Sequence, residues 1–404
     1  MKNFQTFSFI NSVTTSEGNI VQNFQFYNPT RIIFGKEGIN KLPRFLPENS
    51  RILVLYGGQS AEKNGTLNDI RQVINGRFYY EEFGGIEPNP HYETLMKAVE
   101  QIRRNEINFL LAVGGGSVID GTKFIAQAAL YRGDPWNILT GEGEKVKKAL
   151  PLGTILTLPA TGSEMNNRGV VTKAATQEKL SFASDLIYPK FSILDPTKTY
   201  TLPRRQLENG IVDSFVHTLE QYLTYPIGAK VPDYFAEGIL KTLLEVAPDV
   251  VDSPDNYEAR ANFMWAATMA LNGILGTGVP QDWTTHRIGH ELTALYGLDH
   301  ARTLAVIMPV LWRIKKAEKF GKLLQYAQNV WNIQVGTDEE KVDLAIEKTV
   351  EFFKSMGMKM TLAEYDIKKD VDLIVERLEL HHQVDLGEHH NITLDVSRQI
   401  LERI

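Results

Sequence analysis

Two pairs of possible metal-binding side chains stand four residues apart, Asp213 with His217 and His286 with His290. Side chains at this spacing lie on one face of an α-helix, where they can share an ion. His300 follows the second pair closely. One carboxylate and several imidazoles suit a divalent transition metal such as iron(II) or zinc. Apolar residues surround Asp213, and an unpaired buried carboxylate is costly, so we predict a metal site here.

Each of these side chains alone would more often be a hydrogen-bonded or solvated residue, so the prediction depends on the set as a whole. A second group of histidines comprises His381, His382, His389 and His390. We interpret this group as structural or exposed, because adjacent histidines point in different directions on a helix and the neighbouring residues are polar. The chain has no cysteine, which excludes thiolate zinc sites, iron–sulfur clusters and cysteine nucleophiles.

A glycine-rich turn, Gly114-Gly115-Gly116-Ser117, follows an apolar run and precedes a helical pattern. Backbone N–H groups in such a turn, together with the N-terminus of the helix, favour a bound pyrophosphate over an empty turn. The turn is not the G-x-G-x-x-G fingerprint of dinucleotide-binding folds. It also fails as a P-loop, because Lys123 follows Thr122 where the motif requires the opposite order, so we exclude hydrolysis of nucleoside triphosphates.

Two further polar turns follow apolar runs. In residues 57–60, Gly-Gly-Gln-Ser, no acid is present to hold a ribose 2′-hydroxyl, and Ser60 could accept a 2′-phosphate, which favours NADP over NAD. In residues 158–164 the hydroxyl of Thr161 is expected at the carboxyl ends of the strands, where open α/β sheets bind ligands.

The elements that must position these turns are short apolar runs at 51–56, 109–113 and 152–158, with a helical pattern at 92–104. Such runs are typical of strands buried on both faces, and their alternation with helices predicts a parallel sheet. After Pro203 amphipathic helical patterns dominate, at 206–224, 233–247, 257–275, 283–296, 318–330 and 339–355. We therefore expect a loose extension over 1–23, an α/β dinucleotide-binding domain over 24–203 and a helical metal-binding domain over 204–404.

Composition narrows the partners. The chain has 404 residues, of which 43% are hydrophobic and 23% charged, and a formal net charge of −6. A negative protein repels phosphate backbones and anionic lipids, so nucleic acid and membrane surfaces are not expected partners. No apolar stretch is long enough for a membrane span, and the first residues lack a signal-peptide pattern. We expect a cytoplasmic protein.

At this point the motifs coincide with those of a known family. From about Phe24 onward the chain resembles the iron-containing (group III) alcohol dehydrogenases, and within them the butanol dehydrogenases and broad-range NADPH-dependent aldehyde reductases. The motifs that carry the resemblance are PTRIIFG at 29–35, GGIEPNP at 84–90, VGGGS at 113–117, TLPATGSE at 157–164, the Asp213–His217 pair, and the segment from 282 to 300 that contains DWTTHRIGHELTA and GLDH.

The resemblance implies a dehydroquinate-synthase-like fold with the active site between two domains. It implies that the metal ligands are Asp213, His217, His286 and His300, and that His290 lies beside the substrate as a catalytic residue without binding the metal. Gly115, Gly116 and Ser117 would hold the pyrophosphate, and Gly58 and Ser60 the 2′-position. The rest of the cofactor would be lined by Asn89, Asp120, Thr157, Thr161 and Lys179.

The implied function is hydride transfer between NADP, or NAD, and small aldehydes or primary alcohols, in a homodimer that holds one Fe²⁺ or Zn²⁺. Two alternatives keep the fold: a polyol dehydrogenase, or a sugar-phosphate cyclase, which would need a dense cluster of cations around Arg287 and Arg302. A non-catalytic dinucleotide sensor would be expected to lack a ligand. Gln59 departs from the family, whose close members often have a third glycine there.

Overall fold

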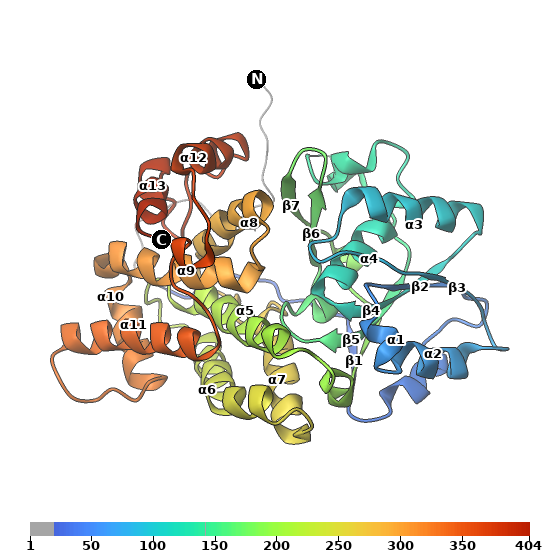
Figure 1. Ribbon diagram of the computed structural model, residues 1–404, viewed down its shortest axis with the longest axis horizontal. Coiled ribbons are helices and arrows are strands. Elements are labelled where there is room, and N and C mark those ends of the chain that lie inside the picture. Colours follow the sequence, from blue (N-terminus) through green and yellow to red (C-terminus); the bar gives the residue numbers. More distant parts are fainter. Residues whose placement is uncertain (1–19, 142) are drawn as a thin grey trace.

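The computed structural model describes residues 20–141 and 143–404. Figure 1 shows an α/β half beside a helical half, which confirms the predicted fold class. Most of the predicted N-terminal extension lies outside the described residues. In the described ranges, no helix is both long enough and apolar enough to cross a membrane.

The α/β half is built on six parallel strands in the order β1-β8-β5-β4-β2-β3. Their bounds are β1 Arg31–Phe34, β2 Arg51–Tyr56, β3 Tyr79–Phe83, β4 Phe109–Gly115, β5 Leu152–Leu158 and β8 Phe191–Leu194. The three apolar runs seen in the sequence are β2, β4 and β5, which lie side by side inside the sheet. The continuous apolar pattern arises because both faces of these strands are covered.

Alternate residues of β2 show how the two faces are covered. Ile52 and Val54 pack in a core with helix α2, and Leu53 and Leu55 pack in a second core with helices α3 and α4. The bounds of the helices in this half are α1 Ser60–Lys63, α2 Thr66–Ile74, α3 Tyr92–Arg104 and α4 Gly116–Ala128. Helices on both faces leave the carboxyl ends of the strands as the edge where binding loops gather.

An antiparallel hairpin interrupts the α/β half between β5 and β8. Its strands are β6 Arg168–Lys173 and β7 Glu178–Ala183. Val171 and Phe182 anchor the hairpin in the core that also holds α3 and α4. The hairpin was not predicted from the sequence, because polar and apolar residues are mixed along its strands. It carries Lys179, one of the predicted cofactor residues.

The helical half follows Pro203. Its helices are α5 Arg204–Tyr222, α6 Lys230–Asp252, α7 Tyr257–Ala270, α8 Thr284–Tyr296, α9 His300–Ile314, α10 Lys316–Asn329, α11 Asp338–Ser355, α12 Val371–Leu380 and α13 Leu394–Arg403. Six of them match the predicted helical stretches. α9, α12 and α13 were not predicted, and α9 proves important because it begins at His300.

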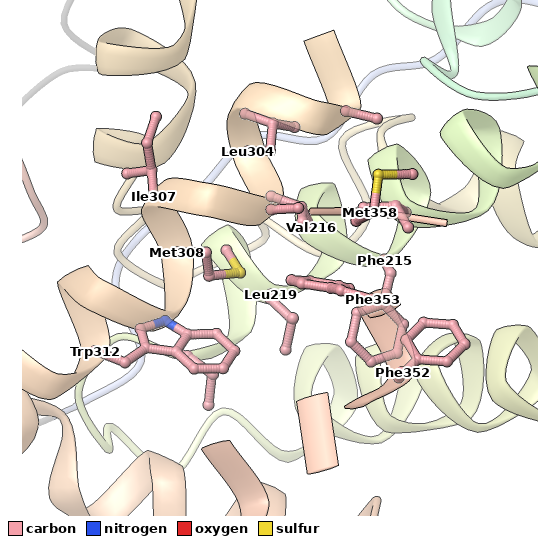
Figure 2. Packing of buried hydrophobic residues seen from close by; sticks show 14 of the residues in the cluster. Phe215, Val216, Leu219, Leu304, Ile307, Met308, Trp312, Phe352, Phe353 and Met358 are labelled. Atoms are coloured by element: carbon pink, nitrogen blue, oxygen red, sulfur yellow. The ribbon is translucent and has the colours of Figure 1, made fainter. Parts of the chain in front are cut away.

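Helix α5 runs through the middle of the helical half and is buried on nearly every side (Figure 1). Its side chains Phe215, Val216 and Leu219 pack against apolar residues of α9 and α11, and burial of each such side chain contributes about 1.5–3 kcal/mol. The contacting residues drawn in Figure 2 include Leu304, Ile307, Met308, Trp312, Phe352 and Phe353. Because α5 is enclosed, its polar side chains Asp213 and His217 are also removed from solvent.

Candidate active site

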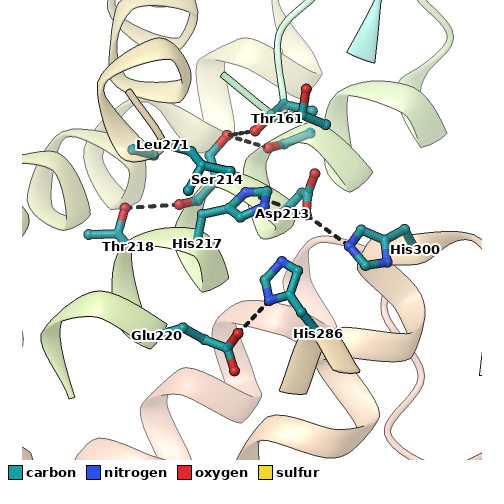
Figure 3. Close-up of polar contacts among 12 residues, drawn as sticks. Thr161, Asp213, Ser214, His217, Thr218, Glu220, Leu271, His286 and His300 are labelled. Carbon is teal, nitrogen blue, oxygen red and sulfur yellow. Dashed lines mark hydrogen bonds and ion pairs between the residues drawn. The ribbon is translucent and has the colours of Figure 1, made fainter. Parts of the chain in front are cut away.

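Three helices of the helical half bring a carboxylate and two imidazoles together. Asp213 on α5, His286 on α8 and His300 at the start of α9 each offer a ligand atom, and these atoms all lie within 4.8 Å of one another. A three-residue connection, 297–299, turns the chain back from α8 into α9, so the His286 and His300 rings are only 5.1 Å apart. Figure 3 shows the side chains pointing toward one another.

His217 and His290 adjoin this group without belonging to it. The His217 Nδ1 atom is 3.6 Å from Asp213 Oδ1, and its ring stacks on that of His286 at 4.6 Å. The His290 ring lies 5.3 Å from the His300 ring. The structure therefore gathers all five residues singled out in the sequence, with His217 at the edge of the group and His290 behind His300.

The donor set fits a divalent cation. Among the described residues, Asp213 Oδ1, His217 Nδ1 and His286 Nε2 are buried without a hydrogen-bond partner, and His300 Nε2 lies 3.9 Å from Asp213 Oδ1. Burial lowers the pKa of all these imidazoles, to about 3 for His286, so their nitrogen lone pairs are free. Burial also raises the pKa of Asp213 to about 8, against the opposing charge of Lys179. Orphaned donor atoms of this kind would be satisfied by a metal ion.

One residue of the site was missed in the sequence. Glu220 lies on α5, seven residues after Asp213 and thus on the same side of the helix. Its Oε2 atom is 2.5 Å from His286 Nδ1, and its Oε1 accepts a hydrogen bond of 2.8 Å from the backbone N–H of Thr285. Burial and the charge of Asp282 raise the pKa of Glu220. The seven-residue spacing is the signal that could have identified it.

The glycine-rich turn joins β4 to α4, as predicted. A Cβ atom on Gly116 would lie 2.4 Å from Thr161 Oγ1, so glycine is required where the chain after β5 crosses the turn. The same chain segment approaches the metal-site helix, since a Cβ on Gly210 of α5 would lie 2.4 Å from the Pro159 carbonyl oxygen. Ser214 of α5 also donates a hydrogen bond to the Ala160 carbonyl. The turn and the metal candidates are therefore held close together.

Three predicted cofactor residues form one chain of hydrogen bonds. The backbone N–H of Asn89 donates to Ser117 Oγ over 3.2 Å, and Lys179 Nζ donates to Asn89 Oδ1 over 2.9 Å. Burial lowers the pKa of Lys179 to about 8, although the charges of Asp213 and Asp120 oppose this effect. Lys179 therefore lies between the glycine-rich turn and Asp213, where its positive charge can interact with groups bound at either place.

Asp120 braces the loops around the turn. Its carboxylate accepts hydrogen bonds from Ser163 Oγ, at 2.6 Å, and from the N–H of Val170 in the hairpin, at 3.0 Å. Lys123, the residue that spoiled the P-loop pattern, is buried and donates to Ser163 Oγ, Asn166 Oδ1 and the Arg168 carbonyl. Both residues hold the hairpin and the loop after β5, and a direct contact between Asp120 and a cofactor stays a prediction.

The remaining cofactor candidates lie at or after the carboxyl ends of β5 and β2. Thr157 is buried near the end of β5, and Thr161 accepts a hydrogen bond from the N–H of Ser163. Gly58 and Ser60 are exposed and follow β2, which is the strand beside β4; Ser60 begins α1. Their contact with the 2′-position of a cofactor stays a prediction.

The histidines of the C-terminal segment lie outside the metal group. His381 Nδ1 is 2.5 Å from Glu291 Oε1, and Arg377 donates to the other oxygen of Glu291 over 2.8 Å. Arg377 also reaches the carbonyl of Gln177 in the hairpin turn. These residues connect α12, α8 and the hairpin, and a structural role for them stays a prediction.

Two family models cover nearly the whole chain. Residues 29–196 match iron-containing alcohol dehydrogenase, and residues 209–403 match the C-terminal region of the Fe-containing alcohol dehydrogenase family.

Individual proteins agree with these matches. The chain is 53% identical to the NADPH-dependent aldehyde reductase YqhD of Escherichia coli, over 95% of this chain and 99% of the relative. It is 40% identical to a probable NADH-dependent butanol dehydrogenase of Bacillus subtilis, over 88% and 93% of the two chains. The crystal structure of YqhD superposes with a TM-score of 0.94 at 52% identity, covering 95% of this chain and 99% of that one.

Proposed function

The chain belongs to the iron-containing alcohol dehydrogenase family, and on that premise we propose that it is a metal-dependent, NADPH-preferring reductase of small aldehydes that also oxidises primary alcohols. The observation that carries the proposal is the buried group of Asp213, His286 and His300, which lies beside Lys179 and the glycine-rich turn. The names of the relatives, an aldehyde reductase and a butanol dehydrogenase, favour this substrate class over polyols and sugar phosphates.

We assign Asp213, His286, His300 and the adjoining His217 as ligands of one Fe²⁺ or Zn²⁺. A bound metal supplies a Lewis acid for a carbonyl oxygen, and a bound nicotinamide supplies the hydride. The chain holds the two reactants at a short distance, and such positioning can supply a large part of the rate gain. Contacts between α5 and the loop after β5 support this role, because they fix the metal candidates relative to the turn.

The remaining residues bind the cofactor and move a proton. Gly115, Gly116 and Ser117 accept the pyrophosphate at the N-terminus of α4. The Lys179 ammonium, which donates a hydrogen bond to Asn89, would lie beside the cofactor. His290, whose ring adjoins His300, would relay a proton from water to the substrate oxygen.

We propose NADPH as the preferred cofactor because the turn at 57–60 offers Ser60 and backbone N–H groups without a carboxylate. Gln59 replaces the glycine common in the family, and its side chain leaves less space for the 2′-phosphate of NADPH. The ratio of kcat/KM for NADPH to that for NADH measures the preference, and a ratio below one would contradict it.

One experiment tests the proposed reaction. Butyraldehyde is assayed with NADPH and with NADH, and metal content is determined on the same sample by mass spectrometry. We expect turnover and one Fe²⁺ or Zn²⁺ per chain. Metal-independent turnover would refute the metal assignment, and cofactor binding without turnover on any aldehyde would favour a sensor.

We further propose a cytoplasmic location, a boundary between two domains near residue 203, and a homodimer.

Support for the homodimer comes from β1, which pairs with β8 alone among the described strands and so offers a free edge. Next to it the exposed rings of Phe34 and Trp265 pack edge to face at 6.1 Å. Light scattering should give twice the mass of the chain, and Phe34→Asp should shift the protein toward monomer. A monomeric wild-type protein would contradict the proposal.

A further inference from the structure

Glu220 makes two hydrogen bonds at the N-terminus of α8, one through each carboxylate oxygen. Oε1 accepts from the backbone N–H of Thr285, and Oε2 faces His286 Nδ1 at 2.5 Å (Figure 3). The carboxylate is 1% exposed. A backbone N–H is always a donor, so the side of Glu220 that faces Thr285 must be an acceptor.

The contact with Glu220 decides which nitrogen of His286 carries the proton. A metal bound at Nε2 needs the lone pair of that atom, so the neutral ring carries its proton on Nδ1 and donates it to Glu220 Oε2. Nε2 is buried and has no hydrogen-bond partner among the described residues, and it is the atom left to face Asp213 and His300. Imidazoles that bind metals commonly donate their second nitrogen in this way.

We propose that Glu220 is a positioning residue that fixes the tautomer and the ring direction of His286, and so sets how tightly the site binds a divalent metal. The inference rests on the proposed metal site. It goes beyond that site because Glu220 is not itself close enough to the other candidates to act as a ligand.

The surroundings of Glu220 hold it in place for this task. The backbone N–H of Asp282 donates to the Glu220 carbonyl over 2.9 Å, so the segment that leads into α8 is tied to α5 at two points. Lys319 of α10 is buried and bridges Asp282 and Glu388, at 2.9 and 2.6 Å. Lys319 thus gives Asp282 an ion-pair partner of its own, and Glu220 keeps its contacts with Thr285 and His286.

Glu220→Gln is a sharp test because an amide cannot make both contacts. If the amide oxygen accepts from Thr285, the NH₂ group faces Nδ1 and drives the proton onto Nε2, where it blocks the metal. If the amide is reversed, two donors face each other at Thr285. We expect the variant to bind Zn²⁺ about 10- to 100-fold more weakly than the wild-type protein.

The Zn²⁺ Kd is measured on the full-length metal-free protein by competition with a chromophoric chelator, alongside the Tm of the metal-free form. Glu208→Gln is the matched control, because Glu208 is also a buried carboxylate of α5 but pairs with Arg204. Its Kd should equal that of the wild-type protein. If Glu220→Gln does not fold, Glu220→Asp replaces it, since a side chain shorter by one methylene cannot reach Thr285 and His286 together.

An unchanged Zn²⁺ Kd in the Glu220 variant would overturn the inference, whether or not the Tm of the metal-free protein falls. A wild-type protein that binds no stoichiometric Zn²⁺ would instead refute the proposed metal site. A weakened Kd with a nearly unchanged Tm would support a positioning role, because a purely structural role would lower the Tm alone.

Discussion

Replacing Gly116 by alanine tests whether close packing, and not only cofactor contact, demands the glycine-rich turn. An added Cβ would lie 2.4 Å from Thr161 Oγ1 and 2.7 Å from its Cγ2, well inside van der Waals contact. Gly116 is the first residue of α4, where alanine is otherwise acceptable. The sign of the effect is therefore decided by the clash with Thr161.

The expected size follows from overpacking in a tight interior, which costs about 1–3 kcal/mol. Improved helix propensity returns roughly 0.5–1 kcal/mol. A net loss of about 1–2 kcal/mol corresponds to a fall in Tm of roughly 2–8 °C for a domain of this size. Differential scanning calorimetry of the cofactor-free protein measures it, and the KM for NADPH should rise in the same variant because the turn must shift.

A second substitution separates the clash from other effects. Thr161→Ala removes both clashing atoms and leaves only Thr161 Cβ, at 3.1 Å from the new methyl group. The double variant should be more stable than the sum of the single variants predicts, by about 1 kcal/mol. A Gly116→Ala protein as stable as wild type, or strict additivity in the double variant, would refute the reasoning.

Three further predictions concern other parts of the molecule. His286→Ala should abolish both stoichiometric metal binding and turnover, because it removes a central donor of the candidate site; a fully active variant without metal would contradict the ligand assignment. Burial lowers the pKa of Lys123 from 10.5 to about 8. Between these pH values the unfolded chain binds more protons than the folded chain, so the free energy of unfolding should rise with pH in the wild-type protein relative to Lys123→Met. The Tm difference between the two proteins, measured at pH 7.5 and 9.5, should therefore shift in favour of the wild type at the higher pH, and a constant difference would count against the buried charge. Arg377→Ala should destabilise the protein by about 3–5 kcal/mol, because the buried Glu291 loses its arginine partner. The exposed ion pair between Arg398 and Asp372 should contribute only about 0–1 kcal/mol. Equal Tm values for Arg377→Ala and Arg398→Ala would show that the buried pair is dispensable.

The sheet was predictable where a strand is covered on both faces and is long enough to stand out as an apolar run; β8 is equally buried but has only four residues. β2, β4 and β5 are continuous apolar runs, whereas β1 and β3 are at the edges of the sheet and mix polar with apolar residues. Helix α9 escaped detection for the opposite reason. Residues 304–312 form an uninterrupted apolar run that contains Pro309, so the alternation of polar and apolar residues that marks an amphipathic helix is absent there.

Spacing along one helix predicted the pairs of the candidate site but not how the pairs meet. Asp213 and His217 share a face of α5 and His286 and His290 share α8, as their four-residue spacing indicates. That His300 and not His290 comes within 4.8 Å of Asp213 depends on the connection between α8 and α9 and on packing between helices. Only the family resemblance anticipated that choice, and nothing in the local pattern of the chain could do so.

Arg377 and Gln177, whose contact joins α12 to the hairpin of β6 and β7, are 200 residues apart. At a translation rate of roughly 5–20 residues per second, about 10–40 s separate the emergence of the two residues from the ribosome. During this interval the hairpin that carries Lys179 lacks its contact with Arg377 of α12, although all strands of the surrounding sheet have already been synthesised. We expect this interval to be the period in which molecular chaperones have the greatest opportunity to engage the hairpin.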